Sequence, residues 1–174
     1  MTSFAAHTVD PTVQSQTIVH LSAMALQQRC SELRHLENTH QTRFHSSRTP
    51  QISMWDYMKR IGKYSGCSPE CLIICLILLD RYVQASQVPI TFRNVHRLTI
   101  ACVLVTAKLR DDIYYSNAYY SSIGGVSTQE INLLELEFLT QIGWETWVEP
   151  SEYDAYVQAL WGRFGQSITG SPAA

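Results

Sequence analysis

The chain has 174 residues, 45% of them hydrophobic, which is enough to bury a substantial core as one domain. Its 13 lysines and arginines against 15 acidic residues give a formal charge of −2, so no global basic field favours nucleic acid as a partner. The five cysteines, an odd number, predict no disulfide framework, and the first residues lack a secretion signal. We therefore expect a protein of the cytoplasm or the nucleus that binds neither nucleic acid nor a membrane.

The N-terminal part is predicted to hold one helix between irregular segments. Residues 1–16 contain Asp10-Pro11 and no apolar periodicity, which predicts a flexible N-terminus. From Thr17 to Glu37 apolar residues recur at helical intervals, so an amphipathic helix is expected to lie on the domain. A polar, locally basic linker follows, and we group this helix and its linker as residues 17–50.

Two helix starts follow. Ser53 precedes Asp56 by three residues, a capping pattern that predicts a helix to about Tyr64. Its apolar face is expected at three-residue steps, at Ile52, Trp55, Met58 and Ile61. Ser68-Pro69-Glu70 combines a capping serine, a proline at the first helical position and an acid. The helix that follows should run from Cys71 to about Ala85 and be buried, because its first half is apolar all round.

The helix expected over residues 93–110, with Asn94 as its cap, is the centre of the predicted fold. Between Leu98 and Ala107 its only polar side chains are two threonines, so neighbouring helices should bury it on all sides. These ten residues fall well short of the roughly 18 needed to cross a membrane. Lys108 ends the apolar run, at the point where the helix is expected to leave the bundle and meet something outside it.

The C-terminal part is predicted to add three helices. A short helix is expected over residues 117–123, and the capping box Ser127-Thr-Gln-Glu130 predicts a longer one from Thr128 to Gly143-Trp144. Its main apolar face contains Ile131, Leu134, Phe138 and Ile142, widened by Leu133, Leu136 and Leu139. An amphipathic helix should follow within residues 146–164, and the small polar residues of 165–174 predict a disordered tail. No strand pattern appears, so the fold class is all-α.

Metal and enzyme chemistry find little support in the sequence. Cys67, Cys71 and Cys75 are spaced by four residues and could hold a soft metal, but structural zinc normally needs four ligands, and we interpret them as small core residues. Asp111-Asp112 could hold a cation, although adjacent acids after a helix are usually a solvated helix end. Gly124-Gly125 belongs to no nucleotide-binding loop. We expect no cofactor and no catalytic activity.

Lys108 and Glu135 differ from the other charged residues, because each lies within an apolar helix. In one interpretation they extend to water or pair with each other. In the other they border an apolar patch and hydrogen-bond the backbone of a partner. Periodicity alone leaves both open.

Several motifs occur in an order and spacing that resemble the cyclin box, over about residues 52–160, and are similar to the phosphate-control cyclins of yeasts and the P- and U-type cyclins of plants. They are Leu79-Asp80-Arg81-Tyr82, Ile90-Thr91, Asn94-Val-His-Arg97, Ala107-Lys108, Asp111-Asp112, Gly124-Gly125-Val126, Glu130-Ile-Asn, Leu134-Glu135, Phe138-Leu139 and Trp144. The resemblance implies a five-helix box around a central helix at residues 51–145, flanked by the N-terminal and C-terminal helices.

The resemblance also implies a function. Cyclins are noncatalytic subunits that bind and activate a cyclin-dependent kinase, and in them a lysine and a glutamate at the positions of Lys108 and Glu135 contact the kinase around its αC helix. The matching apolar interface positions are Val105, Leu109 and Leu139. We expect the chain to be monomeric without its kinase. A cyclin-fold transcription adaptor without a kinase, and a small helical enzyme that uses the cysteines or the acidic pair, are the alternatives.

The sequence departs from many cell-cycle cyclins in its first box helix. The motif Met-Arg-Ala-Ile-Leu, whose arginine pairs with the aspartate at the position of Asp80, is absent. Lys59, Arg60 or Arg97 could replace that arginine, and we predict Arg60. The departure also puts the usual hydrophobic substrate-docking groove in doubt. Too few residues follow Trp144 for a second box, and no Arg-x-x-Leu or Lys-Glu-Asn destruction signal occurs.

Overall fold

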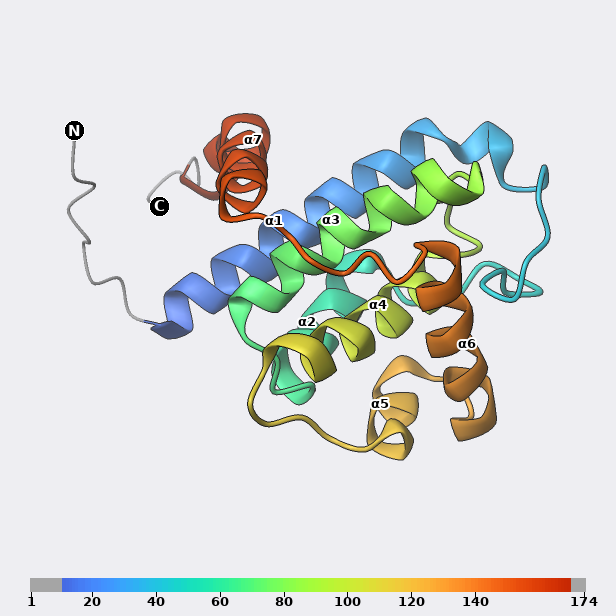
Figure 1. Ribbon diagram of the computed structural model, residues 1–174. Coiled ribbons are helices and arrows are strands. Elements are labelled where there is room, and N and C mark those ends of the chain that lie inside the picture. The colour runs from blue at the N-terminus through green and yellow to red at the C-terminus, as the bar shows by residue number, and fades with distance from the viewer. Residues whose placement is uncertain (1–10, 170–174) are drawn as a thin grey trace.

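The computed structural model describes residues 11–169, which form seven α-helices and a short 3-10 helix and contain no strand (Figure 1). The helices are α1 (Pro11–Glu32), η1 (Arg34–Leu36), α2 (Met54–Tyr64), α3 (Pro69–Ser86), α4 (Val95–Arg110), α5 (Asn117–Gly124), α6 (Thr128–Gln141) and α7 (Pro150–Thr169). The all-α prediction is confirmed. None of the helices within residues 11–169 has both the length and the apolar character that a membrane crossing requires.

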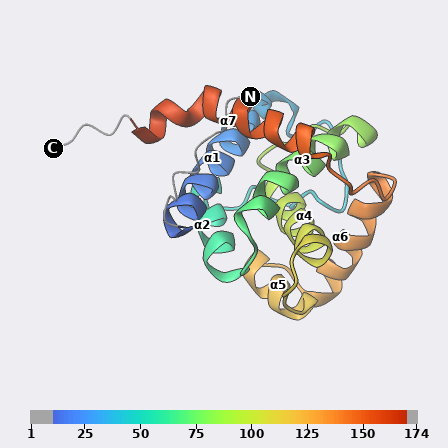
Figure 2. The same cartoon turned by 60° about the vertical axis from the view of Figure 1, so that its left-hand side comes forward.

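Helix α4 lies at the centre, in contact with α2, α3, α5 and α6 (Figures 1 and 2). Every residue from Leu98 to Ala107 is buried, as its uniformly apolar sequence predicts. Helices α1 and α3 run side by side along one flank of the bundle, and α7 packs against both of them. The last turn of α4 reaches the surface, where Lys108 is partly exposed and Leu109 is exposed.

Two of the four predicted helix caps form as expected. The Ser53 hydroxyl accepts from the backbone N–H of Asp56, and Ser127 and Glu130 form a full capping box at the start of α6. Ser68 and Asn94 occupy the cap positions of α3 and α4, but neither side chain caps its helix. Ser68 binds Asp111 instead, and the Asn94 side chain accepts from the backbone N–H of Thr91.

Both flanking helices depart from their predicted bounds, and α1 also ends at Glu32, before the predicted Glu37. Helix α1 begins at Pro11, so the expectation of irregular structure over residues 11–16 is wrong; proline suits the first helical position because its missing N–H needs no partner there. Helix α7 continues to Thr169, because Leu160, Phe164 and Ile168 recur every four residues and pack against the core. Residues 1–10 and 170–174, where the predicted flexible ends also fall, lie outside the described residues.

Two predicted apolar faces also need correction. The buried stripe of α2 consists of Met54, Tyr57, Met58 and Ile61, whereas Trp55 is 39% exposed. Tyr57 fixes this orientation, because its buried hydroxyl donates to the backbone oxygens of His96 and Gly124. On α6 the main face is buried as predicted, but Leu133 and Leu136 point to solvent and do not widen it.

The cysteines behave as core residues. Cys71 and Cys75 are buried in α3, and the Cys102 thiol donates to the backbone oxygen of Cys75. Burial raises the pKa of the Cys67 thiol to about 11 and that of Cys71 to about 12, so both stay protonated near neutral pH. Within residues 11–169, no three histidine, cysteine or acidic side chains are grouped so that they could hold a metal ion.

Candidate functional site

Lys108 and Glu135 meet where the end of α4 passes the middle of α6. The Lys108 Nζ lies 2.8 Å from the Glu135 Oε1, and the two side chains are 30% and 19% exposed. The second carboxylate oxygen, Oε2, accepts from the Asn117 Nδ2 of α5 at 3.0 Å. Both oxygens of Glu135 therefore have a partner, and the pair is held in one geometry at the surface.

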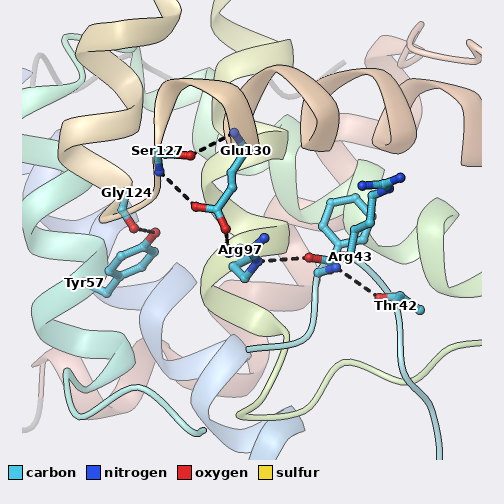
Figure 3. Close-up of polar contacts among 8 residues, drawn as sticks. Thr42, Arg43, Tyr57, Arg97, Gly124, Ser127 and Glu130 are labelled. Carbon is cyan, nitrogen blue, oxygen red and sulfur yellow. Dashed lines mark hydrogen bonds and ion pairs between the residues drawn. The ribbon is translucent and has the colours of Figure 1, made fainter. Parts of the chain in front are cut away.

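A second polar network fixes the start of α6 against α4 (Figure 3). Arg97 of α4 contacts the Glu130 carboxylate at 3.3 Å and donates to the backbone oxygen of Arg43 at 3.0 Å. The backbone N–H of Ser127 lowers the pKa of Glu130, and the nearby Arg97 lowers it further, so this carboxylate stays ionised. Because Glu130 precedes Glu135 by little more than one turn, this contact helps to place Glu135 opposite Lys108.

The C-terminal end of α4 is fixed by Asp111. Its carboxylate accepts from the backbone N–H of Ser68 at 3.1 Å and from the Ser68 hydroxyl at 2.8 Å. Asp111 follows α4 directly and is close in sequence to Lys108. Its hydrogen bonds therefore attach the end of α4 to the start of α3. This structural role occupies one half of the acidic pair that the sequence also offered as a cation site.

The apolar residues predicted for the interface differ in accessibility. Leu109 is 54% exposed and Leu139 is partly buried. Val105 is only 2% exposed and belongs to the core, so it offers a partner little surface, and its contact with a partner stays a prediction. A residue in the turn before the end of a central helix can face either the core or the surface, and apolar composition alone does not distinguish the two.

Trp144 is a surface residue that sequence reasoning did not assign to the site. Gly143 and Trp144 both have positive φ angles, 64° and 61°, and the Trp144 N–H donates to the Leu139 backbone oxygen at 2.9 Å. This conformation is unfavourable for a bulky side chain. It leaves the Trp144 side chain 61% exposed at the end of α6, adjoining Leu139.

The segment that carries Trp144 is anchored by Arg81 of α3. The Arg81 guanidinium donates to the backbone oxygens of Glu145 and Trp147 at 2.9 and 2.7 Å, and it binds the Glu152 carboxylate at 2.8 Å. The Trp147 ring, 62% exposed, lies under the guanidinium of Arg110 at 5.0 Å. Two exposed tryptophans are therefore held on an anchored segment. Trp144 was one of the motifs that resemble the cyclin box, but no sequence pattern indicated that either ring would be exposed.

Asp80 has a different partner from the predicted one. Its carboxylate lies 2.6 Å from the Arg29 Nη1, and Arg29 belongs to α1. The prediction of Arg60 is wrong: Arg29 occupies this position, whereas Arg60 is an exposed residue of α2, which packs mainly against α1 and not against the α3 helix of Asp80. Arg97, the other arginine considered, binds Glu130. The N-terminal helix thus supplies the cation, which sequence motifs confined to the box could not reveal.

The ion pair and the accessible apolar residues near it in sequence on α4, α6 and the segment just after α6 define a surface, which we call the Lys108–Glu135 face. It consists of Lys108, Leu109, Glu135, Leu136, Leu139 and Trp144. A held ion pair beside exposed leucines and a tryptophan is suited to binding a protein, since apolar side chains supply contact area and the charges fix orientation. No group in it is arranged as a nucleophile with a base.

Comparisons with known proteins agree with this architecture. The profile of the Cyclin family matches residues 6–146. The chain is 41% identical to Cyclin-U4-1 of Arabidopsis thaliana over 158 residues, which cover 87% of this chain and 77% of that protein. It is 45% identical to Cyclin-U4-3 of the same plant over 142 residues, which cover 78% and 64% of the two chains.

A rice relative gives the same result over a shorter span. Cyclin-P3-1 of Oryza sativa subsp. japonica is 43% identical over 119 residues, which cover 68% of this chain and 50% of that protein. The resemblance to P- and U-type cyclins that the motifs indicate is thus confirmed. With a family match over most of its length and an all-α bundle around a buried central helix, the chain belongs to the cyclin family.

Proposed function

We propose that this protein is the regulatory subunit of a cyclin-dependent protein kinase, which it binds through the Lys108–Glu135 face and thereby activates. Membership of the cyclin family supports a regulatory role and not an enzymatic one. The observation that carries the proposal is the Lys108–Glu135 ion pair, held by Asn117 at the surface. A core ion pair would not need exposed apolar neighbours, whereas a docking surface does.

The mechanism follows from what an active kinase requires. Its αC helix must place a glutamate against the ATP-binding lysine. A partner that binds the αC helix better in that position shifts the kinase toward the active state by the difference in affinity. Leu109, Leu139 and Trp144 would supply buried apolar contact, and the ion pair would set the register of the two helices.

The experiment is a capture assay with the tagged full chain in extract from the source organism. Wild type should retrieve a protein kinase, and Lys108→Glu or Glu135→Lys should each reduce its recovery about tenfold or more, because each presents the wrong charge to the partner. Arg163→Glu on α7 is the matched control, since it breaks an exposed ion pair with Glu32 elsewhere on the surface.

The exchanged variant Lys108→Glu/Glu135→Lys separates internal pairing from partner contact. It restores two opposite charges at the site but reverses their order toward a partner. If the pair only holds α4 to α6, capture returns in this variant; if the pair contacts the kinase, capture stays low. Unchanged capture by all folded variants would remove both residues from the interface, and retrieval of no kinase would favour the transcription-adaptor alternative.

The cellular process and the location of the proposed complex are less closely defined than its docking face. The resemblance to phosphate-control cyclins suggests a function in nutrient response or in cell-cycle progression and leaves both open, while the plant relatives carry only the names of U- and P-type cyclins. We propose the cytoplasm, the nucleus or both as the location of the complex, because Cys30, Cys67, Cys71, Cys75 and Cys102 are all free thiols, as is usual in a reducing compartment.

A further inference from the structure

A groove of about 970 Å³ lies between α1 and α2, apart from the Lys108–Glu135 face. Its lining includes Val19 of α1 and Trp55, Lys59, Arg60 and Lys63 of α2. In Figure 2 these two helices lie together on one flank, and α6 lies on the other. No part of the kinase-docking proposal uses this groove.

Three positive charges at the groove have no acidic partner. Lys59, Arg60 and Lys63 are exposed, and within the described residues none of them has a carboxylate oxygen within 4.0 Å. The one acid in the lining, Asp56, is engaged at the helix start, where its carboxylate accepts from the Ser53 hydroxyl at 3.1 Å. Although the net charge of the chain is −2, these three side chains create a local positive potential at the groove, which favours an anionic ligand.

Trp55 gives the groove an apolar contact of fixed orientation. The His20 ring of α1 lies edge-on to the indole, with ring centroids 4.5 Å apart and an interplanar angle of 75°. The Lys59 Nζ lies 5.6 Å from the centroid of the same ring. These contacts hold the indole while 39% of the residue stays exposed, so a ligand would meet an already ordered aromatic surface.

The spacing of the cations matches an extended peptide. Lys59 and Lys63 are four residues apart on one helix face, a separation of about 6 Å along the axis. Alternate side chains of an extended peptide repeat at about 6.6 Å on one side. Carboxylates at alternate positions can therefore face both lysines at once.

We infer that the groove between α1 and α2 docks an extended acidic segment of a partner protein, with carboxylates at alternate positions facing Lys59 and Lys63 and an apolar side chain against Trp55. The site is concave and short, which suits a peptide. A nucleic-acid backbone or a membrane surface would draw on a broad basic face, and the chain as a whole is weakly acidic.

The test uses the full chain and a short labelled peptide with aspartates at alternate positions and one central leucine, measured by fluorescence anisotropy. Wild type should bind it, and a peptide with asparagines in place of the aspartates should bind about tenfold more weakly. Lys63→Glu should weaken binding of the aspartate peptide to a similar degree. Trp55→Ala should lower affinity for the leucine peptide but not for an analogue with alanine at the centre.

Arg48→Glu is the matched control, because it makes the same charge change at an exposed residue outside the groove lining. An equal effect of Lys63→Glu and Arg48→Glu would reduce the inference to net charge and overturn it, as would failure of wild type to bind the aspartate peptide. Tighter Lys63-dependent binding of phosphatidylserine vesicles or single-stranded DNA would overturn it in favour of those ligands.

Kinase capture distinguishes this site from the proposed function. Lys63→Glu should capture the kinase as well as wild type does, while Lys108→Glu should bind the aspartate peptide normally. Loss of kinase capture in Lys63→Glu would make the groove part of the kinase interface and overturn the claim of a separate site. Failure of kinase capture by wild type, with the peptide still bound, would overturn the proposed function alone.

Discussion

Gly62 allows α1 and α2 to approach closely, and replacing it with alanine should destabilise the protein. A Cβ at Gly62 would lie 2.7 Å from the Cγ2 atom of Val19, closer than real carbon atoms approach. Val19 is 7% exposed and β-branched, so its side chain has little freedom to turn away. The added methyl group therefore has to push the two helices apart.

The size of the destabilisation by Gly62→Ala follows from two opposing effects. Overpacking of this kind costs about 2–3 kcal/mol, and alanine recovers about 1 kcal/mol over glycine inside a helix, so the net loss is about 1–2 kcal/mol. For a chain of this length that lowers Tm by about 2–8 °C in a calorimetric scan. Gly162→Ala is the matched control in α7, where a Cβ meets no other atom within 4 Å and Tm should rise by about 1–4 °C.

A double-mutant cycle identifies the cause of the loss. Val19→Ala removes the methyl groups that the new Cβ would strike, so Gly62→Ala should cost less in that background by the overpacking energy of about 2–3 kcal/mol. The reasoning is refuted if Gly62→Ala raises Tm as Gly162→Ala does. It is also refuted if the losses from Gly62→Ala and Val19→Ala simply add.

Three further predictions concern polar groups. Tyr57→Phe should lower the free energy of unfolding by about 1–2 kcal/mol in urea, because the backbone oxygens of His96 and Gly124 lose the hydroxyl donor that they share. Burial lowers the pKa of His45 and His96 below 6.5, so the unfolded chain binds more protons than the folded one at mildly acidic pH. The free energy of unfolding should therefore be full above pH 6.5 and fall as pH drops below that value, and a flat profile would contradict this. A double-mutant cycle on Arg29 and Asp80 should give a coupling of about 0.5–1 kcal/mol, as for a partly exposed pair, and zero coupling would remove the pair as a link between α1 and α3.

The box itself could be predicted from sequence because its signals are local. The run from Leu98 to Ala107 is apolar on every side, and only a buried helix accommodates that pattern. The capping box Ser127-Thr-Gln-Glu130 provides acceptors for backbone N–H groups at the start of α6 from its own side chains, without help from distant residues. The end of α7 was missed because packing, and not composition, extends it: Ile168 adds a further contact with the core beyond Phe164.

The candidate site was predicted in part for the same reason. Lys108 and Glu135 stood out as charges within apolar helices, and their pairing was one of the two interpretations left open. The partner of Asp80 and the exposure of Trp144 depend on contacts between segments far apart in the chain. Arg29 lies outside the motif region, and the Trp144 orientation depends on two positive φ angles that no short pattern specifies.

Stimulation of the captured kinase is the most direct test of the central claim. The catalytic subunit, purified alone, is assayed for phosphate transfer to a peptide substrate with increasing amounts of this protein. Wild type should raise the rate to a plateau, and the exchanged variant Lys108→Glu/Glu135→Lys should need at least about tenfold more protein to reach it. Equal stimulation by the exchanged variant would show that the pair acts only within the chain, and no stimulation by wild type would contradict an activating role.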